Sequence, residues 1–80
     1  LVALAAEIHV AHDANALRKL GDCAHRLKSS SRAVGALAMG ALCERLERAC
    51  REGEDARVDA LVVAFRSELD ELLAALRRPV

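Results

Sequence analysis

Apolar residues recur every three or four positions along nearly the whole chain, and this spacing constrains the fold more than any other feature of the sequence. Side chains at this spacing share one face of an α-helix, whereas a half-buried strand would alternate every second residue. One proline and four glycines leave few interruptions, which also favours long helices over strands. The pattern predicts helices over residues 1–12, 14–33, 36–52 and 56–76.

The segments between the predicted helices carry residues that begin or end helices. Asp13 and Asp55 are suited to cap the N-termini of the second and fourth helices, because a carboxylate accepts hydrogen bonds from free backbone N–H groups. Gly35 and Gly53 are suited to end the second and third, because glycine takes the left-handed conformation without strain. Gly21 lies inside the second helix, where it costs about 1 kcal/mol relative to alanine. It is either a tolerated surface glycine or clearance for a docking partner.

Four amphipathic helices with short connections pack as antiparallel neighbours. The 80 residues make one domain, and with one Phe and no Trp or Tyr its core consists mainly of Leu, Val and Ala. We therefore predict an all-α fold, a single antiparallel up-down-up-down four-helix bundle over residues 1–80 whose first helix is short or truncated. The residues expected in its core include Leu27, Leu46, Phe65 and Leu69.

Composition disfavours several classes of protein. The twelve basic and twelve acidic residues cancel, whereas nucleic-acid-binding domains usually combine a basic surface with stacking aromatic residues. No run of about 18 apolar residues is present, so we expect no direct membrane contact. The cysteines, Cys23, Cys43 and Cys50, are odd in number and lack a pairing pattern, which favours free thiols in a reducing compartment and hence a cytoplasmic location.

The second predicted helix carries a histidine on its polar face. Its apolar side comprises Leu17, Leu20, Cys23, Ala24, Leu27 and Val34. Its polar side comprises Arg18, Gly21, Asp22, His25, Lys28, Ser29 and Arg32. Lys28 at i+3 and Ser29 at i+4 flank the His25 ring, so a mobile cation lies one turn away and a small residue leaves the ring open to a bulky partner. A neutral imidazole is a good nucleophile near neutral pH, which makes attack on a phosphoryl group feasible.

This stretch resembles the active helix of histidine-containing phosphotransfer (HPt) domains of two-component phosphorelays. The matching residues are Ala24-His25, Leu27, Lys28, Ser29-Ser30-Ser31, Val34-Gly35-Ala36, Leu42-Cys43 and Leu46-Glu47. The motif content covers residues 13 to 53, and the rest of the chain agrees by helical pattern. Many members have glycine where this chain has Ser29. Because the chain opens at Leu1 rather than Met, we expect it to be a fragment of a larger signalling protein.

The resemblance implies a phosphorelay carrier. His25 would accept a phosphoryl group from the aspartate of a response-regulator receiver domain and pass it to another receiver. Lys28 would stabilise the phosphoryl charge and Ser29 would be the small residue beside it. The resemblance also implies a monomer that carries phosphate without an ATP site of its own, as part of a sensor kinase or beside a hybrid histidine kinase. No cofactor is expected on this domain, and Mg²⁺ is expected on the partner receiver.

The residues expected to bind the partner surround His25 on the polar face. They are Arg18, Gly21, Asp22 and Arg32. Asp22, at i−3, could also accept a hydrogen bond from the His25 ring.

Two other interpretations stay open at this point. The dimerisation and phosphoacceptor helices of a histidine kinase also place a histidine on a bundle, but that family typically has an acidic residue directly after the histidine and a proline a few residues on. Here Arg26 follows His25, and the only proline is Pro79. In a non-catalytic interaction bundle, His25 would be an ordinary surface residue. His9 and His12 have too few neighbouring ligands to predict a metal site.

Overall fold

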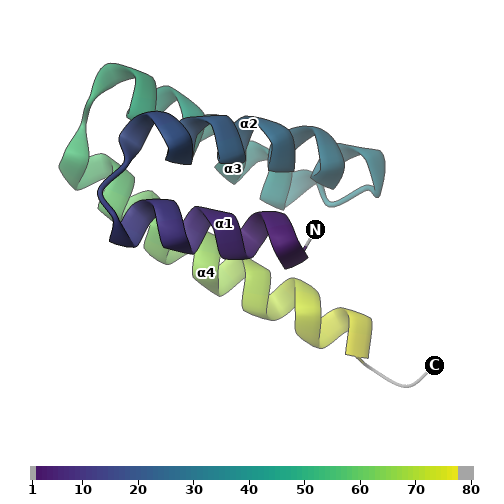
Figure 1. Cartoon of the computed structure of the whole chain (residues 1–80). Helices are drawn as coiled ribbons and strands as arrows, with labels where there is room; N and C mark the ends of the chain where they lie inside the picture. The colour runs from purple at the N-terminus through teal and green to yellow at the C-terminus, as the bar shows by residue number, and fades with distance from the viewer. Residues whose placement is uncertain (1, 78–80) are drawn as a thin grey trace.

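The computed structural model describes residues 2–77, which form four helices and no strand. The helices are α1 (Val2–Asp13), α2 (Leu17–Ala33), α3 (Leu37–Glu52) and α4 (Asp55–Arg77). Successive helices run antiparallel, and the chain folds as a four-helix bundle (Figure 1). The predicted all-α class is confirmed. The predicted start of the first helix at residue 1 lies outside the described residues.

The first turn differs from its prediction. Asp13 is the last residue of α1 rather than the N-cap of α2, which begins only at Leu17 after Ala16. The reason is Asn15, whose φ of 55° is left-handed. This conformation lets the Asn15 N–H donate to the His12 carbonyl (3.0 Å) and the Ala16 N–H donate to the Ala11 carbonyl (2.9 Å). These two bonds form a Schellman motif, which satisfies carbonyls left free at the end of α1.

The same motif ends α2 and α3, where the predictions are confirmed. Gly35 has a φ of 80° and Gly53 a φ of 68°. After Gly35, the Ala36 N–H donates to the Ser31 carbonyl (2.8 Å), and after Gly53, the Glu54 N–H donates to the Ala49 carbonyl (3.1 Å). The prediction that Asp55 caps α4 is wrong by one position. Asp55 is the first residue of that helix, and its carboxylate still suits the positive end of the helix dipole.

The core is made of small and aliphatic side chains from all four helices. Its buried hydrophobic members are Ala5, Ile8, Ala11, Leu20, Cys23, Ala24, Leu27, Met39, Cys43, Leu46, Ala49, Val58, Val62 and Phe65. Among the packed pairs of helices, α2 and α3 share the most extensive interface. Helix α1 reaches α4 through side chains, since the rings of His9 and Phe65 pack edge to face at 5.8 Å. The predicted burial of Leu27, Leu46 and Phe65 is confirmed.

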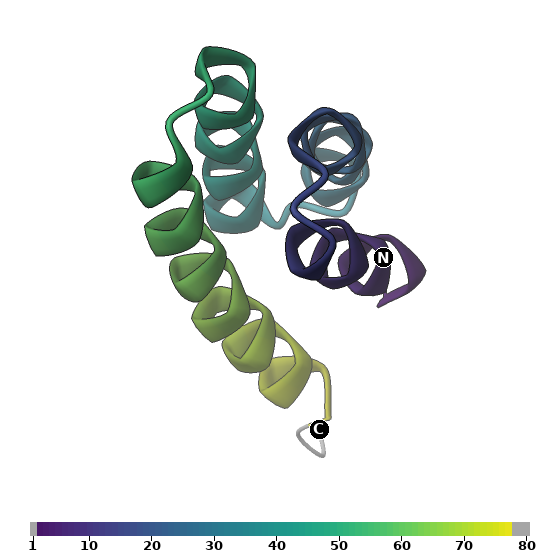
Figure 2. The ribbon, with the colours of Figure 1, turned by 60° about the vertical axis from the view of Figure 1, so that its left-hand side comes forward.

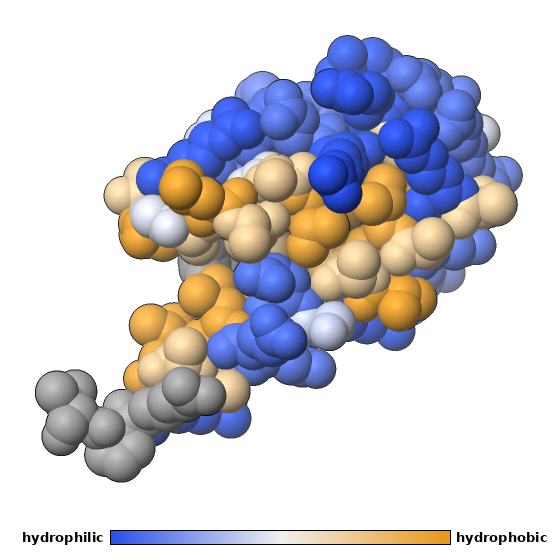
Figure 3. Space-filling view, turned by 180° about the vertical axis from the view of Figure 1, so that it is seen from behind, coloured by the Kyte–Doolittle hydropathy of each residue, from blue (hydrophilic) through white to orange (hydrophobic). Residues whose placement is uncertain are grey.

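The predicted burial of Leu69 is wrong, because Leu69 is only partly covered at the edge of the core. Helix α1 has 12 residues and α4 has 23, which correspond to about 18 Å and about 35 Å of helix. In addition, α4 diverges from α3 toward its C-terminus (Figure 2). The C-terminal part of α4 therefore projects from the body with hydrophobic side chains at its surface (Figure 3), and Leu76 there is 70% exposed.

None of the described helices is both long enough and apolar enough to cross a membrane.

Truncating a core leucine should cost far more stability than truncating one on the projecting part of α4. We expect Leu46→Ala to lower the free energy of unfolding by about 2–5 kcal/mol, because it leaves a cavity in the buried core. Leu76→Ala, the control, should change it by less than about 0.5 kcal/mol. Urea denaturation of the two variants measures the difference, and equal effects would contradict the assignment of the core.

Candidate functional site

His25 lies on the exposed face of α2, as predicted. Its side chain is 60% exposed, and its Nδ1 lies 2.8 Å from Oε2 of Glu47 on α3. A carboxylate can only accept hydrogen bonds, so Nδ1 carries the proton in the neutral ring. The lone pair is then on Nε2, which has no hydrogen-bond partner among residues 2–77. The arrangement presents a nucleophilic nitrogen to the solvent.

Lys28 also binds Glu47 instead of extending into the solvent. Its Nζ donates to Glu47 Oε1 at 2.9 Å, and only 17% of the lysine side chain is exposed. The expectation of a freely mobile cation beside His25 is therefore wrong for this structure. The predicted proximity is right, because Lys28 and His25 contact the two oxygens of the same carboxylate.

Glu47 is the functional residue that sequence reasoning missed. It matched the family pattern, but the pattern suggested no role for it. A glutamate on an amphipathic helix is expected to face the solvent, whereas the side chain of Glu47 is only 18% exposed. The available signal was the short turn at Gly35. A tight hairpin places α3 antiparallel to α2, so that residues near 47 lie opposite residues 25–28.

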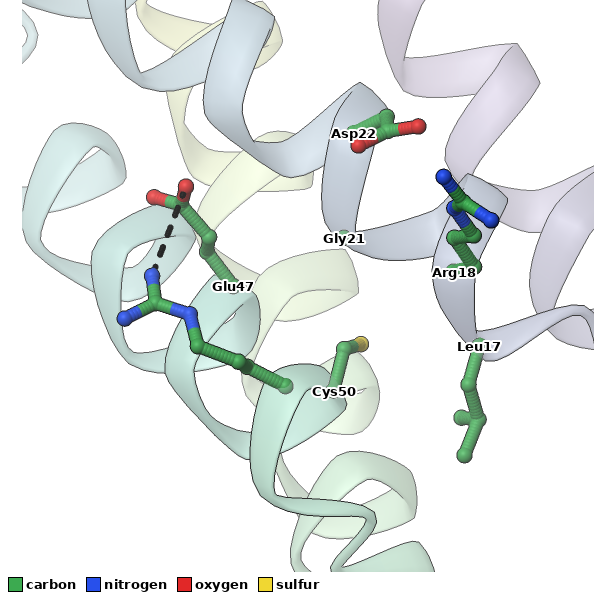
Figure 4. A pocket seen from close by; sticks show the side chains of 7 residues that line it. Leu17, Arg18, Gly21, Asp22, Glu47 and Cys50 are labelled. Atoms are coloured by element: carbon green, nitrogen blue, oxygen red, sulfur yellow. Dashed lines mark ion pairs between the residues drawn. The ribbon is translucent and has the colours of Figure 1, made fainter.

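The charge of Glu47 is maintained by its neighbours. Burial by itself would raise the pKa of the Glu47 carboxyl. Hydrogen bonds from Lys28 and His25, together with the charges of these two groups, outweigh this effect and hold the pKa below its ordinary value of 4.5. Arg51, one turn along α3, adds a longer ion pair of 3.7 Å to Oε2 (Figure 4). Glu47 is therefore ionised at neutral pH.

A groove adjoins this cluster between α2 and α3 (Figure 4). It has a volume of about 430 Å³ and is lined by Leu17, Arg18, Gly21, Asp22, Glu47, Cys50 and Arg51. Three of the four residues predicted to bind a partner, Arg18, Gly21 and Asp22, thus share one groove with Glu47. The ring of His25 bonds to Glu47 and makes no hydrogen bond to Asp22.

Gly21 and the fourth predicted residue, Arg32, contribute to the packing of α2 on α3. A Cβ on Gly21 would lie 3.3 Å from the Cβ of Cys50, so this glycine provides clearance for α3 within the fold. Arg32 lies outside the groove, where it forms an ion pair with Glu44 at 3.1 Å and packs against Gly40. Ser29 is exposed beside His25, as predicted for the small residue.

The other two histidines bind side chains of α4. His9 Nδ1 accepts a hydrogen bond from Arg66 Nε at 3.3 Å, and His12 Nε2 lies 2.8 Å from Asp59. Burial and the charge of Arg66 lower the pKa of His9. Among residues 2–77, no three His, Cys, Asp or Glu side chains are placed together as metal ligands.

The cysteines are free thiols in the described structure. Cys23 and Cys43 are buried, and Cys50 is partly buried in the groove. Burial raises the pKa of Cys43 and of Cys50 to about 11, so both thiols are protonated at neutral pH and are poor nucleophiles.

The depressed pKa of Glu47 predicts a pH-dependent contribution to stability. A carboxyl whose pKa is lower in the folded chain stabilises the fold above its unfolded pKa, and this contribution is lost as the pH falls through the folded value. We therefore expect Glu47→Gln to be less stable than the wild type at neutral pH, and the difference to shrink below pH 4.5.

Denaturant titrations from neutral to acid pH measure this difference. Glu52→Gln, which alters an exposed carboxylate on the same helix, is the control. A stability difference that stays constant or grows on acidification would contradict the role of the ionised carboxylate.

Comparison with known proteins identifies the family. The family model for the Hpt domain matches residues 1–78, and no curated protein and no solved structure matches the chain. The match favours a phosphorelay carrier over the two other interpretations that the sequence left open. Hpt domains carry phosphoryl groups in two-component signalling through response-regulator receivers, and they do so without a catalytic site of their own. With nearly its whole length matched, the chain belongs to the Hpt domain family.

Proposed function

We propose that this domain accepts a phosphoryl group on Nε2 of His25 from the aspartyl phosphate of a receiver domain and passes it to a second receiver. The observation that supports this proposal is the 2.8 Å contact between His25 Nδ1 and Glu47. It leaves the lone pair on Nε2, and the exposed ring leaves room for a protein partner.

The transfer step follows from this tautomer. The Nε2 lone pair attacks phosphorus and forms the N–P bond, while the electrons of the P–O bond leave with the aspartate carboxylate. The ring retains its Nδ1 proton and gains a positive charge. Glu47 accepts the hydrogen bond from that N–H and faces the positive charge, so the carboxylate stabilises the phosphorylated ring. The reverse sequence delivers the group to the second receiver.

Lys28 would lower the cost of bringing a phosphoryl group to this surface. Phosphoryl transfer depends more on positioning and charge neutralisation than on covalent assistance from the protein. Lys28 lies on the neighbouring oxygen of Glu47, so its positive charge acts on the phosphoryl group even while the ion pair is intact. Ser29 adds little bulk beside the ring.

The partner would dock on the exposed face around His25 and on the adjoining groove. Arg18 and Asp22 line that groove on the α2 side, where they can meet charges of opposite sign. Arg32 extends the basic surface toward the other end of α2. The receiver would bring the Mg²⁺, and a hybrid histidine kinase is a source of such receivers.

Replacing His25 tests the proposal directly. We expect His25→Gln to abolish phosphoryl uptake from a phosphorylated receiver, because an amide nitrogen is not a usable nucleophile. Stability should change by no more than about 0.5 kcal/mol, because the residue is exposed and the amide can still donate to Glu47. The label on the wild type should be acid-labile and base-stable, as a phosphohistidine is. His9→Gln, the control, should retain the label, and labelling that survives His25→Gln would disprove the proposal.

Replacing Lys28 tests the role of its charge. We expect Lys28→Ala to slow transfer or to shorten the lifetime of the phosphorylated domain, because a nearby positive charge is lost. Lys28→Arg should retain part of the effect, since the charge remains and the shape changes. Lys19→Ala, which removes an exposed lysine from the same helix, is the matched control. Kinetics of Lys28→Ala equal to those of Lys19→Ala would reduce Lys28 to a structural partner of Glu47.

A further inference from the structure

One oxygen of Glu47 is shared by the phosphoacceptor and by an arginine that the family pattern leaves without a role. Glu47 Oε2 lies 2.8 Å from His25 Nδ1 and 3.7 Å from a terminal nitrogen of Arg51. The Arg51 ion pair is the dashed contact in Figure 4. The imidazole and the guanidinium are therefore close neighbours across the α2–α3 interface. The other oxygen, Oε1, is bound by Lys28.

The two cations bind Glu47 very differently. Lys28 forms a short contact of 2.9 Å and is 17% exposed, so its departure would leave a largely buried carboxylate without its closest cation. Arg51 forms a long contact and is 71% exposed. Exposed ion pairs contribute little to stability, and Glu47 would keep both Lys28 and His25 if Arg51 left. Arg51 is thus the cation that can move at little cost.

We propose that Arg51 is a phosphoryl-binding residue, whose guanidinium leaves Glu47 and binds the phosphoryl oxygens on Nε2 of His25 while Lys28 stays on Glu47. This inference rests on the proposed function. No covalent bond to Arg51 forms or breaks, since the guanidinium only exchanges one set of anionic oxygens for another. When the phosphoryl group departs, Arg51 returns to Oε2.

The chemistry of the two cations supports this division of roles. A guanidinium presents a planar set of N–H donors that matches two oxygens of a phosphoryl group, whereas an ammonium is a compact point charge. Arg51 also lines the same groove as Glu47, the groove proposed above as part of the docking surface for a partner. Lys28 acts on the phosphoryl group from its place on Glu47 Oε1, whereas Arg51 would contact the phosphoryl oxygens directly.

The test is the equilibrium distribution of phosphate between the domain and a receiver. A radiolabelled phosphorylated receiver that labels the wild-type domain is incubated with each variant until the ratio of labelled domain to labelled receiver is constant. This ratio is set by the stabilities of the phosphorylated and unphosphorylated forms of the two separate proteins. A residue that only helps the receiver to dock therefore changes the rate of phosphoryl transfer and leaves the ratio unchanged. A residue that contacts the phosphoryl group changes the ratio itself.

We expect Arg51→Ala to lower the ratio about two- to five-fold, the range expected for loss of an exposed charge pair. Arg48→Ala, which removes an exposed arginine from the same helix away from Glu47, should leave it unchanged, and both variants should melt close to the wild type. Arg51→Lys should recover only part of the ratio.

An unchanged ratio in Arg51→Ala would overturn this inference alone. Failure of the wild type to take up label from every receiver tried would overturn the proposed function and this inference with it.

Discussion

The carboxylate of Glu47 is the interaction on which the site depends. It lies between α2 and α3, accepts a hydrogen bond from His25 and one from Lys28, and has its pKa held below 4.5 by those two partners. A single anion thereby sets the tautomer of the histidine, restrains the lysine and joins the two helices. Because these effects share one group, a change at Glu47 would alter nucleophilicity, local charge and stability together.

The contact forms because the two helices approach closely in a defined register. Gly21 on α2 faces Cys50 on α3, and Gly40 on α3 faces Arg32 on α2, so each helix has a glycine where the other comes near. The left-handed Gly35 closes the turn between them with two backbone hydrogen bonds. The short turn limits the register of the two helices, and residue 47 lies opposite residues 25 and 28.

The rest of the bundle supports this helix pair without contributing to the site. Helices α1 and α4 cover the apolar faces of α2 and α3 with Ile8, Val58, Val62 and Phe65. Two polar contacts, between His12 and Asp59 and between His9 and Arg66, connect α1 to α4, and Glu7 of α1 pairs with Arg26 of α2 at 3.4 Å. Core and site therefore lie on opposite faces of α2, so the exposed face is free to meet a partner while the buried face maintains the fold.

The sequence by itself determined the four helices, their approximate ends at Gly35 and Gly53, and the polar setting of His25, because these follow from local periodicity and from backbone conformations that glycine favours. The left-handed Asn15 was beyond that reasoning, because Asp13 offered a plausible local capping signal, whereas α1 continues through Asp13 and ends with the hydrogen bonds at Asn15 and Ala16. The burial of Leu69 was not predictable from local sequence either. Its position on the apolar face of its helix follows from periodicity, but how much of its side chain is buried depends on how far the neighbouring helices extend.

Tertiary structure also decided the chemistry around His25. The register of α2 against α3 decides whether Lys28 extends into solvent or binds a carboxylate. It also decides whether Glu47 faces the solvent or contacts α2, since residues 25 and 47 are far apart in the chain. Local sequence specifies which face of each helix is polar. Packing between helices sets the position of one polar face against another. That packing brings Glu47 to His25 and forms the hydrogen bond that leaves the lone pair on Nε2.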